Sequence, residues 1–245
     1  MKFDIITLFP EMFKGPFSES IIKRAKDKKI INIDIHQLRD FAYDKHQKVD
    51  DTPCGGGPGM VLKVDVVDRA LAQVKSKKRK GKSRIVMLSA SGQKFTQAKA
   101  IEMSKYDNIV LLCGHYEGFD QRVHDHLVDE EISIGDYVLT GGEIPAMVLV
   151  DAITRMIPGT IKEESIMSES FMPTDNEEHD THGFISQKGH RNKLPSTDYP
   201  LPTNYDYPVY TRPNKYKGWE VPEILLSGDH KKIDEWRKKQ QGRRG

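Results

Sequence analysis

Short apolar runs alternate with amphipathic segments along the first 160 residues or so, and this alternation constrains the fold more than any other feature. Residues 3–8, 85–88 and 109–113 read as short buried strands bounded by turn residues. Residues 64–74 and 96–104 have the apolar spacing of helices. Strands that alternate with helices predict an α/β fold with a mostly parallel sheet.

Charge and proline content divide the rest of the chain. Residues 1–162 form the predicted α/β domain. Residues 163–206 contain nine Asp/Glu against three Lys/Arg, with several prolines, which is typical of a flexible acidic linker or lid. Residues 207–245 carry ten Lys/Arg against five Asp/Glu and predict a small basic helical domain, with helices near Leu226 and over residues 230–240.

Three turns at predicted strand ends combine glycine with polar residues. They span residues 88–92, 112–118 and 133–142. Ligands bind outside the carboxyl ends of strands in such sheets, and glycine lets the backbone approach a ligand closely. The third turn adds Ile134, Tyr137 and Leu139 as apolar walls for an adenine ring. One turn of this kind is explained by a tight connection alone, whereas three in succession favour a cofactor site.

Two glycine motifs do not indicate phosphate binding. Gly81-Lys82-Ser83 imitates the end of a nucleotide-binding loop, but Ser76 stands where its first glycine should be. The glycine run at residues 55–59 is interrupted by Pro58 and follows no predicted strand. A basic cluster at residues 77–84 is a candidate for contact with nucleic acid, or a solvated loop.

No metal site or membrane segment is expected. The two cysteines, Cys54 and Cys113, are far apart, so neither a disulfide framework nor a zinc site is indicated. His124 and His126 would point to opposite faces if that segment is helical, so they cannot bind one metal ion together in the usual i, i+4 arrangement. The chain has no signal peptide and no apolar run long enough to span a bilayer, so we expect a cytoplasmic protein with no membrane partner.

Several motifs match a known family in order along nearly the whole chain outside the acidic segment. The chain resembles the bacterial tRNA (guanine-N1)-methyltransferases. The matching motifs are residues 4–10 (DIITLFP), 38–41 (LRDF), His46, 49–51 (VDD), 55–60 (GGGPGM), 112–114 (LCG), 116–118 (YEG), 133–139 (SIGDYVL), 141–143 (GGE), 210–213 (YTRP) and 226–228 (LSG).

The resemblance implies a fold and an activity. The fold would be of the SPOUT class, in which the α/β domain ends in a trefoil knot. The protein would be a homodimer with active sites at its interface. It would transfer a methyl group from S-adenosyl-L-methionine to N1 of guanosine 37 of tRNA, beside the anticodon. A Mg²⁺ requirement is not visible in the sequence.

The resemblance also assigns residues. Arg155 matches an essential arginine, and Glu169 stands where the family's general base is usually Asp, with Asp175 and Asp206 as alternative bases. Phe171 matches an aromatic residue that packs on the target base. The expected cofactor contacts are Leu88, Ser89, Gly114, Tyr116, Glu117, Ile134, Gly135, Asp136, Tyr137, Val138, Leu139, Gly141, Gly142 and Pro145. The expected tRNA contacts beyond Phe171 are Arg212, His230 and Arg237.

The chain departs from the family pattern in places. His115 replaces a common Arg, Glu169 replaces the usual Asp, and the segment between Phe171 and Tyr207 is longer than usual. Two alternatives therefore stay open. One is a related methyltransferase that acts on ribosomal RNA or on a ribose hydroxyl, and the other is an RNA-binding protein that has kept the fold without the activity.

Overall fold

The computed structural model describes residues 1–76, 81–162, 165, 171, 207–212 and 214–240. The chain forms two compact units, Met1–Ile161 and Lys162–Gly245. The first contains a five-stranded sheet in the order β2-β1-β6-β5-β7, and every neighbouring pair in it is parallel. Its strands are β1 (Lys2–Thr7), β2 (Asn32–Gln37), β5 (Ser83–Lys94), β6 (Asn108–Cys113) and β7 (Glu130–Ser133). The predicted α/β class with a parallel sheet is confirmed.

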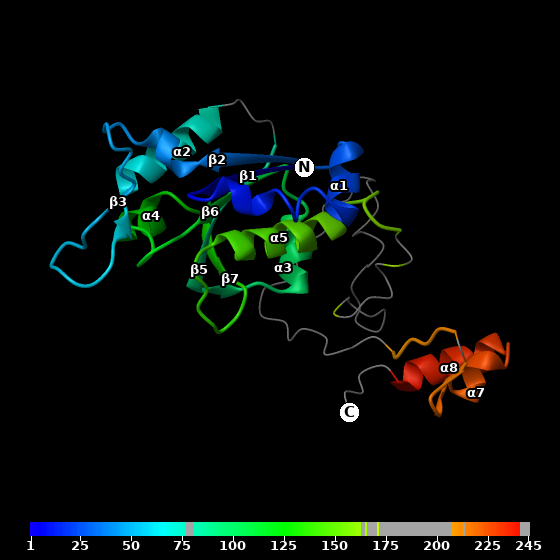
Figure 1. Ribbon diagram of the computed structural model, residues 1–245. Coiled ribbons are helices and arrows are strands. Elements are labelled where there is room, and N and C mark those ends of the chain that lie inside the picture. Colours follow the sequence, from blue (N-terminus) through cyan, green and yellow to red (C-terminus); the bar gives the residue numbers. More distant parts are fainter. Residues whose placement is uncertain (77–80, 163–164, 166–170, 172–206, 213, 241–245) are drawn as a thin grey trace. The chain divides into compact units, whose positions relative to one another are not determined.

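Helices cover both faces of the sheet (Figure 1). The helices α1 (Ser20–Asp27), α3 (Gln97–Met103) and α5 (Glu143–Arg155) share one hydrophobic core with alternate residues of the strands. The helices α2 (Val64–Ser76) and α4 (Gln121–His126) share the second core with the other residues. Strand β6 shows this division most clearly, because all its residues are buried and they alternate between the two cores.

Strand β5 differs from its predicted extent. It continues through the polar residues 89–94, beyond the apolar run at 85–88. It pairs with β7 on both sides of an irregularity, since Leu88 and Gln93 both lie opposite Ile132. A pattern of apolar residues cannot reveal this extension, because its backbone pairs with β7 while its side chains are largely exposed.

The connection from β7 to α5 crosses β5. In the sheet, β5 lies between β6 and β7. After β7, however, the chain returns to the end of β6, where the Gly142 N–H donates to the carbonyl oxygen of Gly114 at 2.9 Å. A Cβ atom on Gly142 would lie 2.6 Å from the Cα atom of Cys113. The crossing is therefore a direct contact of backbone on backbone, which only glycine allows.

Small elements complete the two units. In the first, β3 (Asp50–Asp51) pairs with β4 (Val61–Leu62), and two short 3₁₀ helices span Pro10–Phe13 and Leu38–Phe41. In the second, the helices α7 (Glu223–Leu226) and α8 (His230–Gln240) were expected, but the hairpin of β8 (Lys215–Tyr216) and β9 (Trp219–Glu220) was missed. Its turn, Lys217-Gly218, has positive φ at both residues, as tight hairpins require. The Lys-Gly pair was the available signal.

Candidate functional site

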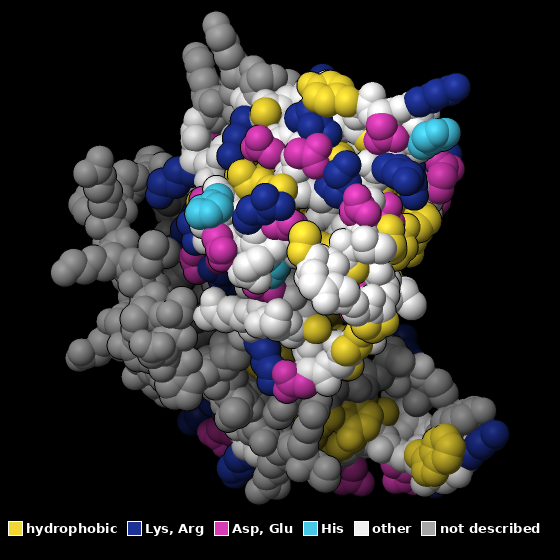
Figure 2. Space-filling view, turned by 90° about the vertical axis from the view of Figure 1, so that its left-hand side faces the viewer, with side chains coloured by type: hydrophobic (Ala, Val, Ile, Leu, Met, Phe, Trp, Pro, Cys, Tyr) yellow, Lys and Arg dark blue, Asp and Glu magenta, His cyan; other side chains and the backbone are white. Residues whose placement is uncertain are grey.

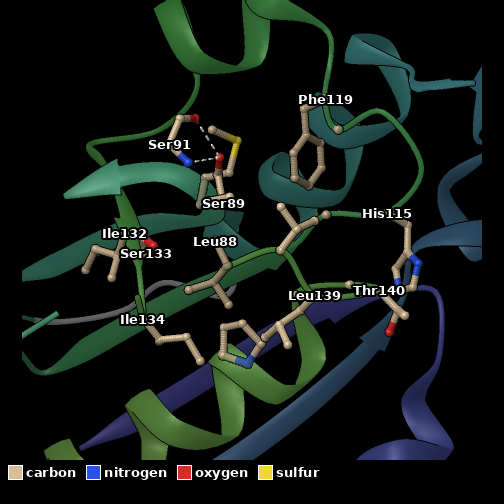
Figure 3. Close-up of a pocket in the computed structure, with 18 of the residues that line it drawn as sticks. Leu88, Ser89, Ser91, His115, Phe119, Ile132, Ser133, Ile134, Leu139 and Thr140 are labelled. Carbon is tan, nitrogen blue, oxygen red and sulfur yellow. Dashed lines mark hydrogen bonds between the residues drawn. The ribbon is translucent and has the colours of Figure 1, made fainter. Parts of the chain in front are cut away.

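The three glycine-containing turns converge on one cavity at the carboxyl ends of β5, β6 and β7 (Figure 3). The cavity has a volume of about 380 Å³. Leu88, Ile134 and Leu139 form part of its apolar wall. Of the expected cofactor contacts, the structure places these around the cavity: Leu88, Ser89, Gly114, Tyr116, Glu117, Ile134, Gly135, Tyr137, Val138, Leu139, Gly141, Gly142 and Pro145.

Asp136 is the one expected contact outside the lining. Its side chain is exposed and forms an ion pair with Lys94, at the far end of β5. Neighbouring residues in a turn point in different directions, so a motif that brings Tyr137 to the cavity does not bring Asp136 there as well. The Asp136–Lys94 pair instead links the third turn to the strand beneath it.

Several lining residues were not among the expected cofactor contacts. Ser91, His115 and Thr140 lie within the three turns, and Phe119 and His124 follow the second turn into α4. The first three could have been found, because every polar residue of a converging turn is a candidate. Phe119 and His124 had no such signal, since only the placement of α4 brings them to the cavity.

One hydrogen-bonded network includes His115, which lines the cavity. The Glu143 carboxylate, 1% exposed, accepts from the Thr7 hydroxyl at 2.6 Å and lies 2.8 Å from Nε2 of His115. Glu143 is the first residue of α5, where the helix dipole favours a negative charge. Burial, followed by the charge of Glu143, raises the pKa of the Cys113 thiol well above its usual range. That thiol is therefore protonated and is no candidate nucleophile.

A second network borders the cavity beside Ser89. The Ser91 hydroxyl bonds Ser89 at 2.9 Å and donates to Glu131 at 2.9 Å. The other Glu131 oxygen lies 3.1 Å from Nδ1 of His124. Burial alone would raise the pKa of Glu131, but the hydrogen bonds from Ser89 and Ser91 and the neighbouring His124 outweigh it and lower that pKa. The network holds the irregular part of β5 against β7.

This network predicts a pH-dependent contribution to stability. At pH 7, Glu131→Gln is expected to lower the unfolding free energy by about 1 kcal/mol, as is typical of a partly exposed hydrogen-bonded charge. Because the pKa is lowered in the folded protein, this stabilisation is present above the ordinary value of 4.5 and is lost as the pH falls through the folded-state pKa. Urea unfolding of both proteins at pH 7 and pH 3 measures the difference. An equal difference at both pH values would contradict it.

The last glycine of the run at residues 55–59 lies against the second turn of the cavity. A Cβ atom on Gly59, whose φ is +78°, would lie 2.3 Å from a Glu117 carboxylate oxygen. The Glu117 N–H donates to the Met60 carbonyl at 3.0 Å, and the Leu62 N–H donates to the Gly118 carbonyl at 2.9 Å. The run does not have the pattern of a phosphate loop, and its last glycine, Gly59, packs beside Glu117, which lines the cavity.

Of the residues expected to act on the substrate, Arg155 belongs to the first unit and does not line this cavity. Arg155 is the half-buried last residue of α5, at the opposite end from Pro145. They are ten positions apart along the helix, which corresponds to about 15 Å. Phe171 is exposed. The candidate bases Glu169, Asp175 and Asp206 lie outside the described residues.

Two of the expected tRNA contacts of the second unit, His230 and Arg237, belong to α8. His230 is the first residue of α8, and Arg237, in its last turn, lies with its guanidinium carbon 5.0 Å from the centre of the Tyr207 ring. Arg212 is exposed. Tyr210 packs near Trp236, with ring centres 6.4 Å apart. This unit therefore presents cations together with aromatic rings, a combination suited to RNA.

Charges are mixed on one face of the molecule. Figure 2 shows Lys/Arg and Asp/Glu side chains intermingled across it, with no large block of one sign among the side chains that are coloured. Residues 77–80 of the basic cluster lie outside the described residues. Over the described part of the chain, no group of three or more His, Cys, Asp or Glu is placed to hold a metal ion. No described helix is long and apolar enough to cross a membrane.

Comparison with known proteins gives one consistent result. The family model described as tRNA (guanine-1)-methyltransferase TrmD matches residues 1–245. A tRNA (guanine-N(1)-)-methyltransferase of Dehalococcoides mccartyi is 45% identical over 244 residues, covering 100% of this chain and 87% of the relative. One of Carboxydothermus hydrogenoformans is 48% identical over 241 residues, covering 98% and 82%.

Proposed function

Because the chain belongs to the tRNA (guanine-1)-methyltransferase family, we propose that it transfers a methyl group from S-adenosyl-L-methionine to N1 of guanosine 37 in tRNA. The observation that most supports this function is the convergence of three strand-end turns on one cavity. Such an arrangement suits a nucleoside-containing cofactor. As an enzyme acting on tRNA, the protein works in the cytoplasm.

The cavity fits S-adenosyl-L-methionine chemically. Leu88, Ile134 and Leu139 offer an apolar surface to an adenine ring, and the glycines beside them let backbone groups come close. Ser89 and Tyr116 offer hydroxyl groups. When bound, the cofactor supplies an electrophilic methyl group on its sulfonium. The chain's task is to orient guanine N1 toward that methyl and to manage the proton that N1 carries.

The proton on guanine N1 defines the roles of two residues. N1 is a poor nucleophile until this proton leaves, so Glu169 accepts it as general base. The Arg155 guanidinium neutralises the negative charge that develops on guanine O6. Phe171 stacks on the base after it leaves the anticodon loop, where unstacking costs little. The RNA is held by three residues of the second unit. They are the exposed Arg212, His230 at the start of α8, and Arg237 beside Tyr207.

A homodimer reconciles the positions of Arg155 and the cavity. Arg155 lies about 15 Å along α5 from Pro145, too far to serve the cavity of its own chain. A second copy packed on α5 would bring its Arg155 to that cavity. Ile144 and Val148 on α5 and Met12 nearby in the Pro10–Phe13 helix expose 46%, 40% and 43% of their surfaces, which suits a buried dimer contact.

We infer that the chain is knotted at this site. The connection from β7 to α5 crosses β5 and returns to β6 at the Gly142–Gly114 hydrogen bond. Threading of this segment through the loop that precedes it would make the trefoil knot of the SPOUT class. The cofactor would then lie in the knot, against all three turns.

Methyl transfer to two tRNA transcripts tests the function. The transcripts are unmodified and identical except for guanosine or adenosine at position 37, and the donor carries a labelled methyl group. We expect label on the first transcript alone, recovered as 1-methylguanosine. Equal labelling of both, or labelling of ribosomal RNA in place of tRNA, would contradict the proposal. Cofactor binding without transfer to any RNA would indicate an RNA-binding protein that has lost the activity.

A further inference from the structure

His115 is held in a hydrogen-bonded chain that joins three separate parts of the fold. Its Nε2 lies 2.8 Å from one oxygen of Glu143, and the other oxygen of Glu143 accepts from the Thr7 hydroxyl at 2.6 Å. The Thr7 hydroxyl in turn accepts from the Phe9 N–H at 2.9 Å. The chain thus links the end of β1, the start of α5 and the turn after β6.

Packing fixes the orientation of the His115 ring. The Phe9 ring meets it edge-on, with centres 4.7 Å apart, and the Tyr116 ring lies 6.1 Å away on a similar angle. The His115 side chain is 14% exposed, and it lines the cavity beside Thr140 (Figure 3). Because the ring is fixed, it can hold the Gly141 backbone that packs against it in one position.

The third turn of the cavity lies directly on the bond between His115 and Glu143. A Cβ atom on Gly141 would be 2.2 Å from Nε2 of His115 and 2.6 Å from a Glu143 oxygen. The backbone of Gly141 is therefore in contact with the hydrogen-bonded pair. The segment of residues 134–142 lines the cavity except at Asp136, and near its end it contacts the His115–Glu143 pair.

We propose that His115 is a positioning residue, which fixes the 134–142 segment for cofactor binding through its hydrogen bond to Glu143. Without the imidazole, the buried Glu143 carboxylate loses a partner and a space opens beneath Gly141. The segment can then move away from its binding geometry. The inference rests on the proposed function, because it assumes that the cavity holds S-adenosyl-L-methionine.

Two substitutions separate the hydrogen bond from the volume of the ring. His115→Leu fills much of the space but cannot donate, whereas His115→Gln keeps an N–H donor at a similar reach. We expect His115→Leu to raise both the Kd and the KM for S-adenosyl-L-methionine by about 10- to 100-fold, as loss of a hydrogen bond to a charged group does. Its kcat at saturating cofactor should fall by less than about threefold, and His115→Gln should stay within about threefold of wild type in Kd.

The matched control is His126→Leu, an exposed histidine at the end of α4 that does not line the cavity. It should bind the cofactor as wild type does. Calorimetric binding, steady-state methyl transfer to the guanosine 37 transcript and the melting temperature of each free protein are measured together. Wild-type protein that binds no S-adenosyl-L-methionine would overturn the proposed function itself. An unchanged Kd in His115→Leu, a loss confined to kcat, or a His115→Gln variant as weak as His115→Leu would overturn only the role of His115.

Discussion

Glu169→Gln is expected to lower kcat for methyl transfer by about 10² to 10⁴, the range that general-base catalysis contributes. The amide cannot take the N1 proton, so guanine stays a poor nucleophile. The side chain keeps its size, and the proposed role of Glu169 involves guanine and not the cofactor, so the Kd for S-adenosyl-L-methionine should not change. Single-turnover transfer to the guanosine 37 transcript, with saturating cofactor and enzyme in excess, measures the chemical step.

The acidic segment offers its own controls. Asp175→Asn and Asp206→Asn remove the same charge from the same stretch of chain, residues 163–206. Each should leave the single-turnover rate within a few-fold of wild type if Glu169 is the base. A loss of more than about a hundredfold in one of them, with Glu169→Gln active, would assign the base to that aspartate.

Gly142→Ala is expected to abolish cofactor binding and to lower the melting temperature by roughly 3 to 10 °C. The added Cβ atom would lie 2.6 Å from the Cα atom of Cys113 and 2.9 Å from the Gly114 nitrogen. Both are backbone atoms, so no side chain can turn aside. Overpacking of this kind costs about 1 to 3 kcal/mol of stability. A domain of this size loses a few degrees of melting temperature for each kcal/mol that is lost. The displacement of Gly142 from Gly114 would also move apart two of the turns that line the cavity.

Gly15→Ala is the matched control, since a Cβ atom there would meet nothing within 4 Å and its φ is not in the left-handed region. It should melt and bind as wild type does. Thermal unfolding with and without S-adenosyl-L-methionine measures both effects at once. A Gly142→Ala protein that melts normally and is stabilised by the cofactor would show that the crossing can widen without cost.

The site could be predicted from the sequence to the extent that local patterns determine it. Strand–helix alternation, with glycine and polar residues at strand ends, was enough to expect that the turns at residues 88–92, 112–118 and 133–142 would meet. Which side chains of a turn face inward depends on its backbone course, and so Asp136 and Thr140 could not be distinguished. The contact between Thr7 and Glu143 joins residues far apart in the chain, and no local pattern encodes it.

Other features of the fold could not be predicted from local sequence patterns. The extension of β5 depends on pairing with β7, a partner later in the chain, and its exposed polar residues resemble a loop. The position of Arg155 relative to the cavity follows from the direction and length of α5. A motif can mark Arg155 as important, but only the geometry shows that it is remote from its own chain's cavity.

The connection from β7 to α5, which crosses β5, has a consequence for how the protein folds. Every strand pair in the sheet joins segments separated in sequence by at least one helix or loop, and β7 pairs with β5, which lies before both α3 and β6 in the chain. Non-local contacts of this kind make folding slow, on the order of milliseconds to seconds or longer. The segment that completes the cavity, residues 134–142, follows all five strands of the sheet in the chain, so it is the last of the three turns to be synthesised. On the ribosome, competence to bind the proposed cofactor would therefore appear only after this turn has been made.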